Sequence, residues 1–482
     1  MEYKSNELEK VLDTGIALSK EKNRNKLLDM ILDAGMELTN CDAGTLYICK
    51  GNKLYFQVMK TISMGVDQGK NGEKIDLPPV EMSEANICSY TVIHKKVLNI
   101  ENVYESDEFD FSGPYRYDKM TGYHTRSMIT IPLLNQEDNA VGVLQLINAK
   151  DADGNIVKFP KRMEHIILSL ASQAAIAVSN ISYMEEIKTQ MWSFTEAMAE
   201  AIDTRTPYNA NHVRNVAKYA GLMADYINER HKEGLTEDYF DENRKEQLVL
   251  GALLHDIGKV STPLSVMNKA TRLETKLHDI EMRLNLFMAK YKVQVLEGTI
   301  SQEQYERNVA KTEEALALAY AINDCGFLDD EKKQALKKVS EYTFEDGTEQ
   351  IPYFTEEEIV HMSVVKGTLT DEERIIMESH VEMTERILSK VHFNSQYKNA
   401  MKWAIEHHEC LDGTGYPKKI SGDDLSLESR ILAVADICDA LLATDRPYKK
   451  PLPKEKAFAI MKDMADKGKI DGGLVELLQN CI

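Results

Sequence analysis

A short stretch near the carboxyl-terminal end of the sequence carries the clearest sign of chemistry. In HHECLDGTGYP, His407 and His408 precede an acidic residue and a glycine-rich turn that ends in Tyr416 and Pro417. Imidazole is a common metal ligand, and glycine tolerates the backbone angles of a sharp bend. The stretch therefore predicts two adjacent histidines that meet one metal ion because the backbone bends beside them.

Further candidate ligands occur at or within predicted helices. An apolar helical run ends in His255 and Asp256, which alone would fit a hydrogen-bonded core histidine as well as a metal ligand. Their companions are His212, His380 and Asp436. A buried carboxylate needs a partner or a metal, and imidazole with carboxylate suits first-row divalent metals. The set predicts a metal site built from helices of one domain.

Together these motifs resemble the HD-GYP phosphodiesterases, a branch of the HD superfamily. The resemblance covers about residues 195–272 and 365–482, including NHVRNVAKYA, LTDEERIIMESH, RILAVADICDAL and TDRPYKK besides HDIGK and the HHE–GYP stretch. It implies an all-α domain with a bridged metal site. It also implies hydrolysis of cyclic di-GMP to the linear dinucleotide pGpG or on to GMP, by water activated at the metals.

The resemblance implies a role for each matching residue. One metal would be held by His212, His255, Asp256 and Asp436, and a second by His380, His407 and His408, with Asp256 bridging. Asp256 and Lys259 would be catalytic, and the substrate would meet Lys259, Gly415, Arg446 and Lys449. Some members use a glutamate to help bind a third metal, but Tyr208 stands at that position. We therefore expect two divalent ions, with iron or manganese favoured.

Other functions remain open at this stage. The same chemistry could act on another cyclic dinucleotide, such as cyclic GMP-AMP. A receptor could bind a cyclic dinucleotide without cutting it, although a receptor has no need of seven metal ligands. Zinc, nickel and cobalt would also suit the donor set.

A charged insertion separates the His255–Asp256 pair from His380. Residues of about 273–358 predict two helices joined at Gly298 and Thr299, as an antiparallel hairpin. Its charge density predicts a solvated protrusion, and it is a possible site for a protein partner. Three other histidines are predicted to lie on solvated faces: His278, His361 and His392.

The amino-terminal part predicts an α+β module with an antiparallel sheet. Residues 6–38 have helical periodicity, residues 43–59 form two β-rich runs about a Gly-Asn turn, and residues 127–134 and 140–149 predict two more strands. This part resembles a GAF domain. The GAF cyclic-nucleotide signature is matched by Asn148, Lys150, Phe159 and Glu164, but Met163 stands where aspartate is expected. The module could therefore be a sensor or a dimerisation module without ligand.

These patterns divide the chain into three parts. We expect a GAF-like domain over 1–180, a connecting helix over 181–205 and an HD-GYP domain over 206–482. An apolar stripe at spacings of three and four runs along the helical segment 162–201. It predicts a coiled-coil stalk, and hence a homodimer formed through the GAF domain and the connecting helix.

Composition limits the functional classes. The chain has 482 residues, a formal net charge of −20 and 43% hydrophobic residues. The negative charge argues against a general nucleic-acid-binding surface. The absence of an apolar run of eighteen residues predicts no membrane span. Seven scattered cysteines without a CxxC pair predict reduced thiols and a cytoplasmic location.

Overall fold

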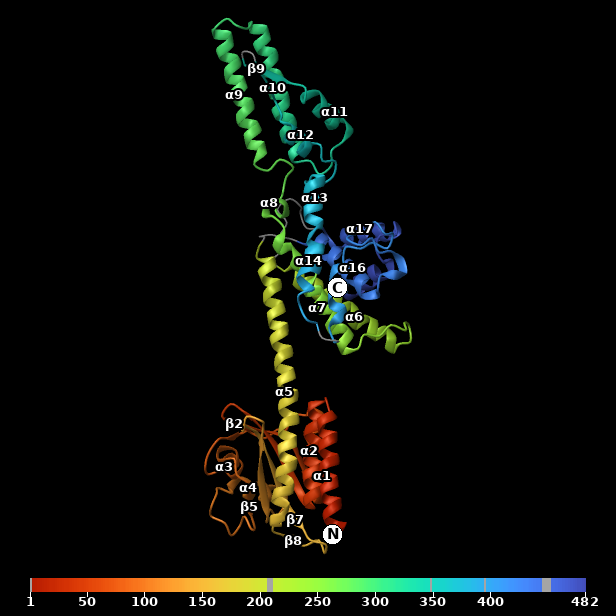
Figure 1. Ribbon diagram of the computed structural model, residues 1–482. Helices are drawn as coiled ribbons and strands as arrows, with labels where there is room; N and C mark the ends of the chain where they lie inside the picture. Colours follow the sequence, from red (N-terminus) through yellow and green to blue (C-terminus); the bar gives the residue numbers. More distant parts are fainter. Residues whose placement is uncertain (1, 206–210, 347–348, 394–395, 444–451) are drawn as a thin grey trace. The chain divides into compact units, whose positions relative to one another are not determined.

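The computed structural model describes residues 2–205, 211–346, 349–393, 396–443 and 452–482. The chain divides into two compact units, Met1–Met191 and Trp192–Ile482 (Figure 1). Each unit has a hydrophobic core of its own.

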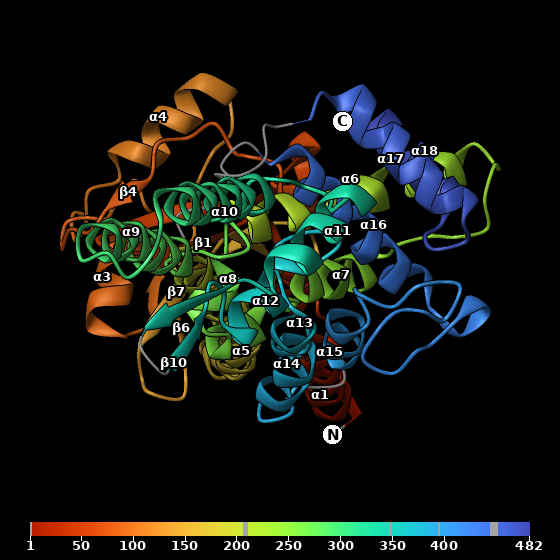
Figure 2. The same cartoon turned by 90° about the horizontal axis from the view of Figure 1, so that it is seen from above.

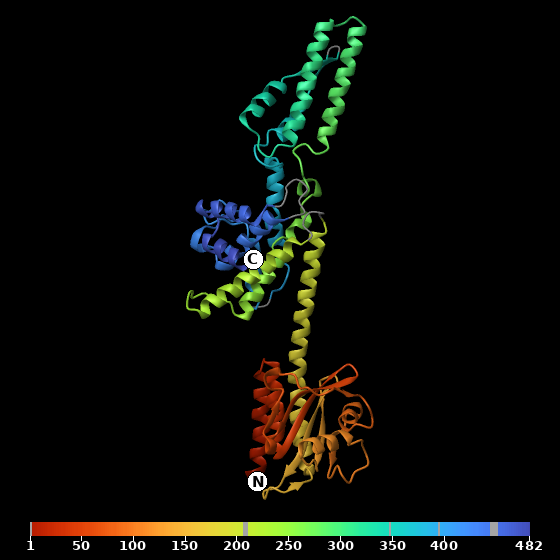
Figure 3. The ribbon, with the colours of Figure 1, turned by 180° about the vertical axis from the view of Figure 1, so that it is seen from behind.

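Unit 1 contains one antiparallel sheet with helices on both faces (Figures 1 and 3). Its strands are β1 (Cys41–Lys50), β2 (Lys53–Thr61), β3 (Val66–Gln68), β4 (Val80–Glu81), β5 (Leu98–Ile100), β6 (Met128–Leu134), β7 (Ala140–Lys150) and β8 (Ile156–Val157). Its helices are α1 (Glu2–Lys20), α2 (Arg24–Thr39), α3 (Ile87–His94), α4 (Ser112–Thr121) and the first part of α5 (Lys161–Asp203). The sheet order is β3-β2-β1-β7-β6-β5, with β4 on β2 and β8 on β7.

The predicted strand pairs are confirmed. β1 and β2 form a hairpin, as do β6 and β7. The helical segment predicted over 6–38 is present as two helices, because the chain breaks between α1 and α2. There the side chain of Asn23 accepts a hydrogen bond from the backbone N–H of Lys26, which caps the start of α2.

Helix α5 belongs to both units. Ile167, Leu170 and Ala174 are buried in the core of unit 1, whereas Ala199 lies in the core of unit 2. Among the described residues, α5 is also the helix that is long and apolar enough to cross a membrane by length and composition. Of its most apolar 18-residue window, 39% is buried inside the structure.

Unit 2 is helical around the candidate site. The helices outside the insertion are α6 (His212–Lys232), α7 (Glu242–Leu254), η3 (Ile257–Ser261), α8 (Leu264–Met267), α13 (Asp371–Glu378), α14 (His380–Leu388), α15 (Lys398–Ile405), η4 (Gly422–Asp424), α16 (Leu427–Leu442), α17 (Lys454–Asp466) and α18 (Gly472–Cys481). Apolar faces of α6, α7, α16, α17 and α18 form the main core. This core fixes three helices that carry candidate ligands. His212 is the first residue of α6, His255 directly follows α7, and Asp436 lies within α16.

The insertion is more elaborate than two helices. The predicted hairpin is present as α9 (Lys276–Leu296) and α10 (Gln302–Asn323), which lie side by side (Figures 1 and 2). It is followed by α11 (Asp330–Val339), a two-stranded sheet of β9 (Thr343–Asp346) and β10 (Glu349–Pro352), and α12 (Glu356–Met362). The domain is therefore not purely α-helical.

The insertion also has its own hydrophobic core, which corrects the prediction of a merely solvated protrusion. Phe287 of α9 stacks on Phe344 of β9 with ring centroids 4.5 Å apart, and Ala315 of α10 is fully buried. The high charge density lies on the outside of this core. The insertion thus packs as a small module within unit 2.

Candidate metal centre

Helix ends bring the candidate ligands together. His212 and His380 are the first residues of α6 and α14, His255 directly follows α7, and His407 and His408 follow α15. Asp436 instead lies within α16. In three groups, ligand atoms lie within 4.8 Å of one another: His212–His255–Asp436, His380–His407–His408 and His255–Asp256–His407.

Asp256 lies between the two histidine sets and is almost fully buried. Its Oδ2 is 3.4 Å from Nε2 of His212 and 3.2 Å from Nε2 of His255. Its Oδ1 is 3.4 Å from Nε2 of His380 and 4.0 Å from Nε2 of His407. Each carboxylate oxygen therefore faces a different set, which is the arrangement required of a bridging ligand.

Backbone carbonyls fix the orientation of three histidines. Nδ1 of His255, His380 and His407 lies 2.6 Å from the carbonyl oxygen of the residue three positions earlier. Because a carbonyl only accepts hydrogen bonds, Nδ1 carries the proton and Nε2 keeps its lone pair. These three rings therefore present Nε2 as a donor atom for a metal.

Unpartnered atoms test whether a metal fits this cluster. Within the part of the chain that the structure describes, Nε2 of His255, His380 and His407 and Oδ1 of Asp256 are buried without a hydrogen-bond partner. Buried polar atoms normally have partners, and leaving them unpaired is costly. Four such atoms converge in one cluster, and a pair of divalent cations would satisfy them.

Adjacent histidines at a bend present different ring nitrogens to the cluster. His407 directs Nε2 toward Asp256, whereas Nδ1 of His408 lies 4.0 Å from Oδ2 of Asp436. The two ring centroids are 4.0 Å apart. Use of opposite nitrogens explains how consecutive residues reach one site.

Burial and charge set the protonation of the ligands. Burial lowers the pKa of His407 and His408, for His408 to about 3, so both rings are neutral at pH 7 and offer lone pairs. For His212, burial opposes protonation, but the carboxylates of Asp256, Asp436 and Asp439 outweigh it and raise the pKa well above its usual value. The cluster is thus an electronegative buried site that favours a cation.

Gly258 allows helix α14 to approach the His255–Asp256 turn. A Cβ at this position would lie 1.8 Å from the carbonyl oxygen of His380 and 2.5 Å from the backbone nitrogen of Thr384. Thr384 fills the remaining space, since its hydroxyl accepts from the Gly258 N–H at 3.0 Å and donates to the His255 carbonyl at 3.0 Å. This contact holds His380 beside Asp256.

Glu409 organises the glycine-rich loop after the histidine pair. Its buried carboxylate accepts hydrogen bonds from the backbone N–H groups of Lys418 at 2.7 Å and Ile420 at 3.0 Å. A Cβ on Gly415 would lie 2.4 Å from the backbone nitrogen of Cys410, so the loop folds tightly onto the histidine segment. The structure thus gives Gly415 a packing role in the loop, beside its predicted place on the substrate side.

Lys259 lies at the site, with its Nζ 2.5 Å from Oδ2 of Asp256. Its backbone carbonyl accepts a hydrogen bond from Arg205 at 2.6 Å, which helps to anchor the turn. The predicted substrate-side residues Arg446 and Lys449 lie outside the described residues, as does Tyr208.

Two further carboxylates near the site were missed in the sequence. Oδ2 of Asp439, one turn after Asp436 on α16, lies 2.7 Å from Nδ1 of His212. Asp439 thus orients the ring of His212 in the way that backbone carbonyls orient the rings of His255, His380 and His407. Asp203, the last residue of α5, is buried, and burial together with Asp256 raises its pKa to about 6, although His212 acts in the opposite direction. The three-residue spacing from Asp436 was the available signal for Asp439.

The other histidines had mixed outcomes. His278, with 73% of its side chain exposed, and His392 are exposed, as predicted. The prediction for His361 is wrong, because its ring is buried and its Nδ1 lies 2.8 Å from Nζ of Lys269.

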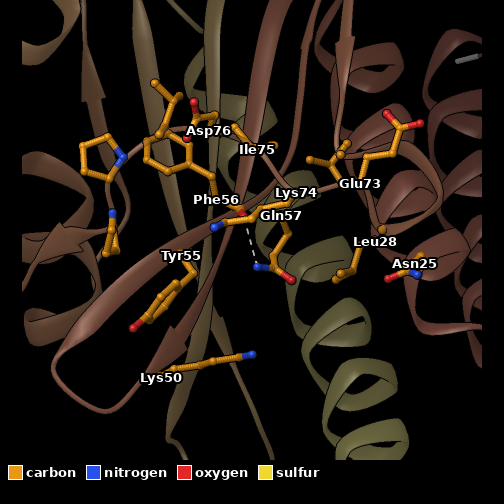
Figure 4. A pocket seen from close by; sticks show the side chains of 16 residues that line it. Asn25, Leu28, Lys50, Tyr55, Phe56, Gln57, Glu73, Lys74, Ile75 and Asp76 are labelled. Atoms are coloured by element: carbon orange, nitrogen blue, oxygen red, sulfur yellow. Dashed lines mark hydrogen bonds between the residues drawn. The ribbon is translucent and has the colours of Figure 1, made fainter.

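The GAF signature residues in unit 1 have structural partners. Oδ1 of Asn148 accepts hydrogen bonds from the N–H groups of Arg126 and Ser127, and Lys150 forms an ion pair with Asp42 at 2.5 Å. A separate open pocket of about 670 Å³ lies beside β2 (Figure 4). Its lining mixes lysines, carboxylates and prolines and does not define a ligand class.

Comparison with known proteins assigns a domain type to each unit. A GAF-domain model matches residues 23–178, and two HD-domain models match residues 209–318 and 294–474. A solved GAF domain of a phosphoenolpyruvate-protein phosphotransferase from Coxiella burnetii is 12% identical, with a TM-score of 0.31, over 38% of this chain and 98% of that chain.

Curated relatives match only part of the sequence. The 3'3'-cGAMP-specific phosphodiesterase 3 of Vibrio cholerae is 45% identical over 97 residues, which are 20% of this chain and 20% of that protein. A cyclic di-GMP phosphodiesterase of Thermotoga maritima is 39% identical over 101 residues, which are 21% of this chain and 27% of that protein. The chain thus spans about a quarter or less of each relative's length.

The fold and the domain matches define an HD-domain protein with an amino-terminal GAF domain. Its HDIGK and HHE–GYP motifs resemble those of the HD-GYP phosphodiesterases, and the relatives that match part of the chain are named as cyclic-dinucleotide phosphodiesterases.

Proposed function

We propose that unit 2 is a metal-dependent phosphodiesterase that hydrolyses cyclic di-GMP to pGpG, GMP or both. The observation that carries this proposal is the convergence of seven candidate ligand residues, Asp256 among them, in one cluster with four of their buried atoms unpartnered. A site that only bound a cyclic dinucleotide would not require such a donor set. The relatives named as cyclic-dinucleotide phosphodiesterases support the substrate class.

The proposed ligand sets follow the two oxygens of Asp256. His212, His255 and Asp436 would hold one divalent ion, and His380, His407 and His408 the other, with Asp256 shared. Bound divalent ions would lower the pKa of a coordinated water to about 7 and polarise phosphoryl oxygens. We favour iron or manganese, because histidine with bridging carboxylate suits both.

The chain's own residues would position these partners. Asp256 would fix the distance between the two ligand sets. Lys259, whose side chain is 18% exposed, would turn its ammonium from Asp256 to a phosphate oxygen and neutralise charge that develops there. Arg446 and Lys449 are proposed as further cations on the substrate side.

Regulation and assembly complete the proposal. The GAF domain would control hydrolysis, and two copies would associate through this domain and α5 in the cytoplasm. Exposed apolar side chains on α5 support pairing: Met184 and Ile187 expose 68% and 65% of their surface, and Phe194 exposes 68%. Met184 belongs to the stripe predicted from the sequence, and Ile187 and Phe194 flank it, three residues after Met184 and Met191.

The substrate class can be tested by chromatography of reaction products. Anaerobically purified protein of measured metal content is incubated separately with cyclic di-GMP and with 3'3'-cGAMP. The proposal expects linear pGpG or GMP from cyclic di-GMP. Faster cleavage of 3'3'-cGAMP would transfer the assignment to that substrate, which the match to the Vibrio cholerae relative favours as second candidate. Tight binding of both without products would establish a receptor instead.

A further inference from the structure

The outward face of α9 carries an apolar stripe that the core of the insertion does not use. We call it the α9 seam, and it consists of Met282, Leu286, Ala289, Val293 and Leu296. Met282 exposes 60% of its surface, Leu286 54%, Val293 49% and Leu296 80%. The inner face of the same helix is buried through Ile280, Leu284, Phe287 and Tyr291. α9 is thus apolar on two faces, only one of which is covered.

The seam has the spacing of a coiled coil. Its residues follow one another at intervals of four, three, four and three, which is the alternation of heptad positions d, a, d, a, d. A single helix packed on a globular core shows a broader stripe with a period of 3.6 residues. Val293 at an a position and Leu296 at a d position favour a parallel coiled coil of two helices. The spacing therefore indicates another helix as the occupant.

The charges beside the seam indicate which helix. Arg283 and Lys290 flank it but are paired within the insertion, Arg283 with Glu358 at 2.6 Å and Lys290 with Asp346. Lys292 and Glu297 also flank it and are exposed, and neither has an ion-pair partner among the residues that the structure describes. They lie five positions apart, at heptad positions g and e. In a parallel pair of identical helices, g of one copy faces the e position five residues later in the other.

We propose that the α9 seam binds the α9 seam of a second copy of this chain as a parallel two-stranded coil. Each Lys292 then pairs with Glu297 of the other copy, so the contact forms two symmetric ion pairs around an apolar centre. The helix is already formed against α10, so pairing does not incur the cost of helix nucleation. Ala289 at the middle allows the two backbones to approach closely. This inference does not depend on the proposed enzymatic function.

Site-specific cross-linking tests the register. The full-length Leu296→Cys protein is oxidised at micromolar concentration, and disulfide-linked peptides are identified by mass spectrometry. A parallel pair places the two d positions face to face, so a 296–296 disulfide is expected. Val295→Cys is the matched control, because its side chain lies off the seam, and wild-type protein accounts for the seven native cysteines. Equal cross-linking of the two variants, or no 296–296 product, would overturn the proposal.

Charge reversal tests the ion pairs in the Leu296→Cys background. Lys292→Glu places two acidic residues opposite each other and should reduce the 296–296 product several-fold. Adding Glu297→Lys restores opposite charges and should restore cross-linking, which a mere folding defect would not do. Two outcomes contradict a parallel pair: no effect of Lys292→Glu, or no recovery in the double variant. Because α5 is also proposed to pair, the cross-link rather than the molecular mass is the readout.

Discussion

At the scale of residues, the site depends on the two oxygens of one carboxylate. Asp256 presents Oδ2 to His212 and His255 and Oδ1 to His380. That these candidate ligands belong to one site could be predicted from the sequence because histidine and aspartate recurred at helix ends within a recognisable motif. For Asp439, the three-residue spacing from Asp436 was a signal of a shared helix face, but it does not show which ring the carboxylate contacts. The burial of His361 depends on Lys269, which is 92 positions away in the sequence.

Removal of the Asp439 carboxylate should weaken metal binding. Asp439 fixes the ring of His212 through Nδ1, and loss of such a partner lowers metal affinity by about 10–100-fold. Titration calorimetry of the metal-free Asp439→Ala protein with Mn²⁺ should show this loss, and Asp439→Asn a smaller one. Asp463→Asn, on the exposed face of α17, is the control. Unchanged Mn²⁺ affinity in Asp439→Ala would show that His212 needs no such support.

A methyl group at Gly258 should separate α14 from the His255 turn. The added Cβ meets backbone atoms of His380 and Thr384, so Gly258→Ala is expected to destabilise the protein by about 1–3 kcal/mol and to reduce its metal content. Denaturant unfolding and metal analysis give the two readouts. In the control Gly221→Ala, the new Cβ would lie 3.8 Å from Val249, an ordinary contact. If both variants bind metal like the wild type, the close approach is not what positions His380.

At the scale of elements, the root of the insertion is tied to the helix that leads to the site. Nζ of the buried Lys269 contacts His361 of α12 at 2.8 Å and Glu373 of α13 at 2.6 Å. Helix α13 ends just before His380. The helices of the hairpin could be predicted from their periodicity, whereas β9 and β10 were missed although Asp346 and Gly347 form a known hairpin signal. Their short strands are held by contacts with α9 that local sequence does not reveal.

His361 should make stability depend on pH in the acidic range. Burial and Lys269 lower its pKa, Lys276 adds to this, and Glu373 and Glu357 oppose it. In the unfolded state this histidine has a pKa of about 6.5 and binds more protons, so its contribution to the free energy of unfolding falls as pH drops below about 6.5 and is constant above it. Denaturant unfolding between pH 7.5 and 5 should show a shallower dependence for His361→Gln than for wild type.

The exposed His278 provides the control for this measurement. His278→Gln removes an exposed imidazole from the same insertion without removing a buried contact, so the pH dependence of this variant should match that of the wild type. Contributions of the metal-site histidines are common to all three proteins and cancel in the comparison. Equal slopes for His361→Gln and wild type would mean that His361 is not held neutral by Lys269.

At the scale of the whole molecule, one helix contributes to the cores of both units. α5 begins beside the sheet of unit 1 and ends at Asp203, a buried carboxylate of unit 2. The helix and its apolar stripe could be predicted from sequence because periodicity is a local property. The sequence could not show which residues of that stripe are covered, since Ile167 is fully buried whereas Met184 exposes 68% of its surface.

Charges on the exposed apolar side chains that flank the α5 stripe should dissociate the proposed dimer. Ile187→Glu combined with Phe194→Glu places acidic residues where the second copy would pack, so sedimentation velocity should show a shift from dimer toward monomer. Thr189→Glu adds the same charge at an exposed position on the opposite side of the helix and serves as the control. A double variant that sediments as the wild type would exclude this stretch of α5 from the interface.

The most direct test of the central claim is the coupling of metal content to turnover at Asp256. Metal per chain and hydrolysis of cyclic di-GMP are measured on the same preparations of wild type and the His255→Ala/Asp256→Ala variant. We predict two divalent ions per wild-type chain with linear products, and loss of both metal and products in a variant that keeps its helical circular dichroism. A folded variant that still cleaves cyclic di-GMP would contradict the assignment of this cluster as the catalytic metal centre.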